Sequence, residues 1–238
     1  MKINDELEKL YLNHIDYLNK SHREINDKKI KAEGPFLVKC SESNYFFAGK
    51  KIVFVGQENN GWTSSIKLPV TENYILSELM NEYEKLKFGL EQQRRPIFGV
   101  MHKIISRCNL DYNSCMYLNI WKYCSFVLDK NGKRKGIKPV NKLKEITEKT
   151  NQLIHYELKI LKPHVVVFFT GPSYDGNIRK NIGDVEFKVY LNYKKNVMSE
   201  LSFKDFNFRA IRCYHPSYMR RIGKESIFID EITKFINE

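Results

Sequence analysis

The chain has 238 residues, a net charge of +12, and 42% hydrophobic and 13% aromatic residues. This length allows one large or two small domains, and no linker divides the chain. The apolar content can supply a core, which excludes a chain that is disordered throughout. The positive charge favours a polyanionic partner such as nucleic acid. The Lys-, Asn- and Ile-rich composition that AT-rich genomes encode would also raise the lysine count without such a partner.

The cysteines and the apolar runs indicate the compartment. The five cysteines are odd in number and show no C-x-x-C spacing, and a chain of this size does not need disulfides. We therefore expect reduced thiols and a cytoplasmic protein. The first 18 residues are charged and amphipathic, unlike a signal peptide. The longest apolar run, residues 165–169, is too short to cross a bilayer, so we expect no membrane partner.

The N-terminal segment predicts helical structure. Residues 3–19 place apolar side chains at helical spacing, which predicts an amphipathic helix packed on the main domain. The highly charged residues 20–34 predict a loop or a frayed helix, and Gly34-Pro35 then interrupts the chain. We expect one domain over residues 1–238, with residues 1–35 as a helical extension and residues 50–225 as its core.

The rest of the chain alternates predicted strands and helices. Residues 51–55, which are apolar at every position after Lys51, predict a strand buried on both faces of a parallel sheet. Segments rich in apolar residues at 115–120, 165–169 and 208–214 predict three more strands, and a hairpin is expected near 185–193. Helical spacing is found between the strands, and the longest helix is predicted at 141–161. This alternation predicts a three-layer α/β domain with a mostly parallel sheet.

Polar residues follow three of the predicted strands. Gly56-Gln57-Glu58-Asn59 follows the first, Asn119 ends the second, and His215-Pro216-Ser217 follows the last. Ligands of open α/β sheets bind outside the carboxyl ends of parallel strands, which lie on one edge. A carboxylate, an amide and an imidazole can therefore converge there on a small ligand. Each residue also has a structural interpretation: the acid could cap the next helix, the imidazole could fix a turn, and the amide could bond to backbone.

These motifs, in this order, resemble those of the uracil-DNA glycosylase superfamily. The resemblance spans residues 50–225 and rests on Gly-Gln-acid, Leu118-Asn119, a long helix with Lys-Pro before the third strand, and His-Pro-Ser. Leu118 to Cys124 is also similar to the Asn-x-x-Lys-Cys stretch of bacterial and archaeal members. The resemblance implies a three-layer αβα sandwich around a central four-stranded, mostly parallel sheet of order 2-1-3-4. It also implies hydrolysis of the N-glycosidic bond of uracil or another altered base flipped out of DNA.

The resemblance assigns roles to five residues. Glu58 would activate water or stabilise the oxocarbenium-like state, and His215 would donate to a carbonyl oxygen of the leaving base. A donor positioned in this way lowers a barrier by ~3 kcal/mol. Asn119 would bind the base, because an amide pairs with adjacent donor and acceptor groups and leaves the wrong base unpaired, and Gln57 is expected beside it as a base-binding residue. Trp62 is the candidate stacking partner, by its proximity to the loop.

Residues expected to contact DNA lie after the last strand and in a basic loop. The expected set is Ser217, Tyr218, Met219, Arg220, Arg221, Lys133 and Arg134. Ser217 and nearby N–H groups would hold a phosphate, with the arginines supplying charge. Met219, in preference to Tyr218, would fill the vacated base stack. The basic loop would add affinity that salt weakens.

The chain departs from the family at several positions. The acid is Glu58 where the best-known uracil enzymes have Asp, and Asn59-Asn60-Gly61 stands where many members have a proline. Some members hold an iron–sulfur cluster on cysteines, of which only Cys124 has a counterpart here, so we expect no cluster, metal or other cofactor. We expect a monomer whose partner is single- or double-stranded DNA. Two alternatives stay open: a non-catalytic nucleic-acid-binding member of the same fold, and a nucleoside or nucleotide hydrolase.

Overall fold

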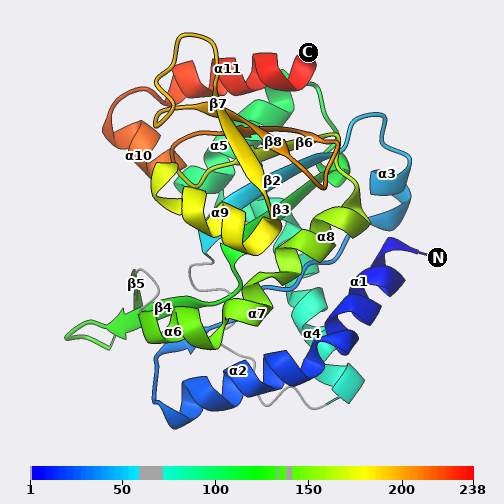
Figure 1. The fold of residues 1–238 in the computed structure, drawn as a ribbon, viewed down its shortest axis with the longest axis vertical. Helices are drawn as coiled ribbons and strands as arrows, with labels where there is room; N and C mark the ends of the chain where they lie inside the picture. The colour runs from blue at the N-terminus through cyan, green and yellow to red at the C-terminus, as the bar shows by residue number, and fades with distance from the viewer. Residues whose placement is uncertain (1, 59–71, 133, 138–140) are drawn as a thin grey trace.

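A computed structural model describes residues 2–58, 72–132, 134–137 and 141–238 of the chain (Figure 1). Within these ranges the central sheet has six strands in the order β3-β2-β6-β9-β8-β7. In chain order these strands are β2 (Ile52–Glu58), β3 (Cys115–Trp121), β6 (Val165–Phe168), β7 (Val185–Val189), β8 (Ser199–Phe203) and β9 (Arg209–Arg212).

The sheet is parallel at one side and antiparallel at the other. β3, β2, β6 and β9 run parallel, with Ile52 opposite both Cys115 and Val165. β8 pairs antiparallel with β9, and β7 pairs antiparallel with β8. The described sheet therefore has more strands than the four expected, because the predicted hairpin adds to its edge. The second strand of that hairpin begins at Ser199, beyond the range predicted for it.

The parallel strands form the centre of the core. Ile52 to Val55 have no exposed surface, and all seven residues of β3 are buried. Strands that are covered on both faces need apolar residues at consecutive positions, which explains the unbroken apolar run at 52–55. Phe54 stacks on Phe169 with ring centroids 5.9 Å apart, and Phe98 meets Tyr117 edge-on at 5.6 Å.

Helices cover both faces of the sheet (Figure 1). The α-helices of the described ranges are α1 (Ile3–Asn13), α2 (Ile15–Asp27), α3 (Glu42–Phe46), α4 (Glu72–Lys85), α5 (Pro96–Arg107), α6 (Asn141–Ile146), α7 (Glu148–Asn151), α8 (Leu153–Leu161), α9 (Asp175–Ile182), α10 (Pro216–Arg221) and α11 (Glu225–Asn237). Short 3₁₀ segments are η1 (Lys87–Gln92), η2 (Tyr112–Ser114) and η3 (Pro172–Tyr174). α8 and α9 pack against β3, whereas α5 packs with α10 and α11.

The helix predicted at 141–161 is divided into α6, α7 and α8. Thr147 Oγ1 donates to the Leu143 carbonyl at 2.8 Å, and Asn151 Nδ2 donates to Thr147 Oγ1 at 3.1 Å. Asn151 Oδ1 accepts from the backbone N–H of Lys122 at 2.9 Å. Side chains of this kind compete with the helical hydrogen bonds, which accounts for the breaks that apolar spacing alone did not predict.

The N-terminal extension is joined to the core by buried polar contacts. α1 buries Leu7, Leu10 and Tyr11, and α2 continues to Asp27 through part of the segment expected to be loop or frayed. The Tyr11 hydroxyl donates to Glu157 of α8 at 2.9 Å and accepts from a backbone N–H at 3.0 Å. Glu157 also forms an ion pair with Lys122, and neither side chain has exposed surface. The extension therefore completes a buried charge network.

A second, antiparallel sheet is separate from the central sheet. Its order is β1-β4-β5, with β1 (Ala32–Glu33), β4 (Cys124–Leu128) and β5 (Arg134–Ile137). β4 and β5 form a hairpin that extends away from the main body at the lower left of Figure 1. Part of the predicted basic loop is thus a strand.

Candidate functional site

The carboxyl ends of the parallel strands meet at one edge of the sheet. Because β2, β3, β6 and β9 are parallel, the sequence motifs that follow them share this edge. The edge carries Gln57 and Glu58 at the end of β2, Asn119 near the end of β3, and His215 after β9. The structure thus brings four of the predicted site residues to the same side of the domain.

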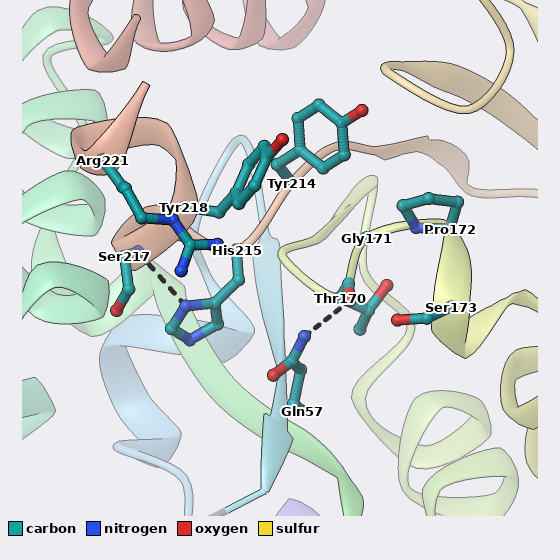
Figure 2. Close-up of a pocket in the computed structure, with 10 residues that line it drawn as sticks. All are labelled: Gln57, Thr170, Gly171, Pro172, Ser173, Tyr214, His215, Ser217, Tyr218 and Arg221. Carbon is teal, nitrogen blue, oxygen red and sulfur yellow. Dashed lines mark hydrogen bonds between the residues drawn. The ribbon is translucent and has the colours of Figure 1, made fainter. Parts of the chain in front are cut away.

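A pocket of about 440 Å³ opens at this edge (Figure 2). Its lining comes from β2, from the loop after β6, and from the segment after β9. The lining residues are Gln57, Thr170, Gly171, Pro172, Ser173, Tyr214, His215, Ser217, Tyr218 and Arg221. The volume lies in the range of pockets that bind small molecules. Glu58 and Asn119 lie outside this lining, so the pocket joins Gln57, rather than Glu58, with His215.

His215 is held as a neutral hydrogen-bond donor. It precedes Pro216, and its Nδ1 accepts from the Ser217 backbone N–H at 3.2 Å, which caps α10 (Figure 2). An Nδ1 that accepts carries no hydrogen, so the ring hydrogen of the neutral form is on Nε2. Burial lowers the pKa of His215 to about 4, because the charged form loses its hydration. At neutral pH this side chain therefore offers an N–H group without a charge.

Gln57 is fixed against the loop that follows β6. Its Nε2 donates to the Thr170 carbonyl at 2.7 Å, and Figure 2 shows the side chain between His215 and that loop. Gly171 follows with φ of 71°, a conformation that suits glycine. A side-chain amide whose nitrogen is engaged in this way presents its oxygen as an acceptor.

Glu58 is held by a tyrosine from the same loop. The Tyr174 hydroxyl donates to Glu58 Oε2 at 2.7 Å, and Tyr174 is largely buried. Burial, and then the charge of Glu58, raise the pKa of Tyr174, so its hydroxyl stays protonated and remains a donor. The contact ties the end of β2 to the start of α9.

Asn119 is completely buried and bonded to a neighbour on its own strand. The Tyr117 hydroxyl donates to Asn119 Oδ1 at 2.9 Å. Asn119 lies opposite Gly56 in the parallel pairing, at the end of the sheet that holds the pocket. The structure thus places this amide beside the strand that carries Gln57 and Glu58.

The segment after His215 corrects one expectation. Met219 has no exposed surface and belongs to the hydrophobic core, whereas Tyr218 is 37% exposed and lines the pocket. α10 starts at Pro216, and this start turns Met219 inward with Pro216. Preferring Met219 over Tyr218 as the residue that enters the base stack was therefore wrong for this conformation.

The two arginines of α10 differ in position. Arg221 lines the pocket, and its guanidinium lies 4.9 Å from the centroid of the Tyr218 ring. Arg220 is absent from this lining and forms an ion pair with Glu225. Ser217 is exposed at the pocket rim, where a phosphate could approach it. Of the pair, Arg221 is the one placed to supply charge at the pocket.

For three predicted residues the structure describes no side chain. Trp62 and Lys133 lie outside the described residues. Arg134 is the first residue of β5, which pairs it with Leu128, and its side chain is not among those described. The roles of these three residues stay predictions.

Sequence reasoning missed the partners that hold the site residues. Thr170, Tyr174 and Tyr214 come from the ends of β6 and β9, and Tyr117 comes from within β3. A polar loop after the third predicted strand was the available signal for Thr170 and Tyr174. Strand alternation was the signal for Tyr117, because residues two apart on a strand face the same side.

Within the described ranges, no three His, Cys, Asp or Glu side chains come together as a metal site would need. In the same part of the chain, no helix combines the length and apolar character required to cross a bilayer.

Comparison with known proteins found similarity to a solved structure. No protein-family model and no curated protein sequence matches this chain. The crystal structure of wild-type Pedobacter heparinus SMUG2 is similar to it with a TM-score of 0.47 at 12% sequence identity, over 79% of this chain and 75% of that chain.

Proposed function

We propose that this protein is a DNA glycosylase-like hydrolase that cleaves the N-glycosidic bond of uracil or another altered base flipped out of DNA. The observation that carries the proposal is the pocket at the carboxyl edge of the parallel strands, which brings Gln57 and His215 together. These residues belong to the first and last motifs of the resemblance, which lie far apart in the chain. The net charge of +12 suits a polyanionic substrate.

His215 acts on the leaving base. When the bond from the base to the sugar breaks, its electron pair goes to the base, and negative charge grows on a carbonyl oxygen of that base. The Nε2–H group of a neutral imidazole donates a hydrogen bond to this oxygen as the charge develops. Such a donor, fixed before the reaction, stabilises the transition state more than the ground state. The bond from the Ser217 N–H to Nδ1 keeps the hydrogen on the nitrogen that the reaction requires.

Glu58 acts on the sugar and on water. The sugar becomes oxocarbenium-like as the base leaves, and a nearby carboxylate stabilises that positive charge. The same carboxylate orients the water whose oxygen bonds to the sugar carbon, while the base receives a proton. Tyr174 fixes one carboxylate oxygen, so the direction of the group is set before substrate binds.

Arg221, Ser217 and Tyr218 contact the DNA. They lie together at the rim of the pocket, where Arg221 attracts a phosphate and the Tyr218 ring presents a flat apolar surface to the neighbouring bases. In this proposal Tyr218 takes the place of Met219 beside the flipped nucleotide.

The test is an assay for abasic sites. Single- and double-stranded oligonucleotides carrying uracil, hypoxanthine, xanthine or an oxidised pyrimidine are incubated with the protein and then cleaved at abasic positions. We expect release of at least one base, with His215→Ala slower by about 10²–10³-fold. His164→Ala is the matched control, because His164 Nδ1 also accepts a backbone N–H, from Lys51, but at the amino end of the strands.

The assay separates the alternatives. Equal rates for both histidine variants would contradict the role of His215. Salt-sensitive oligonucleotide binding with no base released from any substrate would favour the non-catalytic nucleic-acid-binding protein instead.

A further inference from the structure

The carboxamide of Asn119 is bonded at one end only within the described part of the chain. Its Oδ1 accepts from the Tyr117 hydroxyl at 2.9 Å, whereas its Nδ2 is buried and has no hydrogen-bond partner among the described residues. Asn119 has no exposed surface. A buried N–H group without a partner costs about 1–3 kcal/mol, and a ligand that accepts a hydrogen bond from it removes this cost.

The missing side chain of Gly56 leaves the space for this arrangement. Gly56 lies opposite Asn119 in the parallel ladder. A Cβ atom at Gly56 would lie 2.4 Å from the Tyr117 hydroxyl oxygen and 2.5 Å from Asn119 Oδ1. Both distances are too short for non-bonded atoms. The tyrosine and the amide can therefore meet only because the facing position is glycine.

Tyr117 favours one of the two orientations of the amide. In the observed orientation the hydroxyl donates to Oδ1, and Nδ2 alone lacks a partner in the described part. In the reverse orientation Nδ2 would donate to the hydroxyl oxygen, and both Oδ1 and the hydroxyl hydrogen would need new partners. Burial and the charge of Glu58 raise the pKa of Tyr117, although its bond to Asn119 lowers it, so the hydroxyl keeps the hydrogen that it donates.

We infer that Tyr117 is a positioning residue that fixes the Asn119 amide with its Nδ2 hydrogens directed to the bound base. This inference rests on the proposed function. Its consequence is selectivity for a base with a carbonyl oxygen at the edge read by Asn119. Uracil presents an oxygen where cytosine presents an amino group, and the amino group would face the amide hydrogens donor to donor. Without Tyr117 the amide could turn over and accept from that amino group.

The experiment measures discrimination between bases without cleavage. Oligonucleotides carry 2′-fluoro-2′-deoxyuridine or 2′-fluoro-2′-deoxycytidine at one position, because the electron-withdrawing fluorine disfavours the oxocarbenium-like state. Dissociation constants are measured for the wild-type protein, Tyr117→Phe and Tyr123→Phe. Tyr123 is the matched control, because its hydroxyl is also buried but, unlike that of Tyr117, has no hydrogen-bond partner within the described ranges and lies in a separate core cluster.

We expect the wild-type protein and Tyr123→Phe to bind the uracil oligonucleotide more tightly by about tenfold or more. In Tyr117→Phe we expect the ratio of the two dissociation constants to fall close to one. A substitution that only loosens the fold weakens both complexes and leaves the ratio unchanged. An unchanged ratio in Tyr117→Phe would therefore overturn the inference.

A second measurement does not depend on the folding of a variant. In the wild-type protein labelled with ¹⁵N, the Asn119 side-chain amide signals should shift with the uracil oligonucleotide and stay in place with the cytosine one. The absence of a shift with uracil, while that oligonucleotide binds, would overturn the inference and leave the proposed function standing. Failure of the wild-type protein to release any base would instead overturn the proposed function.

Discussion

His215 should stay neutral far below the pH at which histidines usually titrate. Burial lowers its pKa from 6.5 to about 4. With that pKa, about nine-tenths of the rings are neutral at about pH 5, whereas an imidazole that titrates at its ordinary value would be only about 3% neutral. If His215 acts as a neutral donor, its titration should not reduce base release between about pH 8 and about pH 5.

The same shift predicts a dependence of stability on pH. The folded-state pKa lies below the unfolded one, so the unfolded chain binds more protons between pH 6.5 and about 4. The stabilisation is therefore fully present above pH 6.5 and is lost as the pH falls towards 4. At 1.36 kcal/mol per pH unit the loss approaches about 3 kcal/mol of unfolding free energy.

The measurement is an NMR titration of the imidazole nitrogens. The chain has six histidines, and the signals that disappear in His215→Gln identify the ring of interest. We expect hydrogen on Nε2 at neutral pH and a midpoint near 4. Urea unfolding at several pH values should show a steeper loss of stability below pH 6.5 in the wild-type protein than in His215→Gln. A midpoint at 6 or above, or hydrogen on Nδ1, would refute the reasoning.

Three further substitutions test other parts of the structure. Gly56→Ala places a Cβ 2.4 Å from the Tyr117 hydroxyl oxygen and should lower the unfolding free energy, measured in urea, by about 1–3 kcal/mol. Unchanged stability would show that the Tyr117 side chain does not lie against residue 56. Arg221→Ala should weaken oligonucleotide binding whatever the base and reduce the slope of log affinity against log salt by about 1, so an unaltered slope would exclude a phosphate contact. Lys122→Met leaves the buried carboxylate of Glu157 without a cationic partner and should lower the free energy of unfolding by about 3–5 kcal/mol. A decrease below about 1 kcal/mol would contradict the buried ion pair.

The parallel strands could be predicted because strands buried on both faces are apolar at every position. Residues 52–55 and 115–118 are apolar throughout, and both runs lie in the central sheet. β8 was not predicted as a member of this sheet, because Ser199–Phe203 is short and has only two apolar residues, Leu201 and Phe203. Its place is decided by pairing with β9, which the local pattern does not encode.

The site could be predicted only in part for a similar reason. A residue at a strand end can be found from the sequence, but its partner across the fold cannot. Tyr174 lies 116 positions from Glu58, and Thr170 lies 113 positions from Gln57. The orientation of Met219 depends on the residue at which α10 begins, which the sequence motif did not specify.

The bond between Tyr11 and Glu157 has a consequence for synthesis of the chain. The two residues are 146 positions apart. At a translation rate of about 5–20 residues per second, Tyr11 leaves the ribosome roughly 7–30 s before its partner. During that interval the apolar face of α1 has no α8 to cover it. The buried network of Tyr11, Lys122 and Glu157 cannot form until all three residues have emerged. α1 therefore leaves the ribosome well before α8, and its contacts with α8 can form only after residue 157 has emerged.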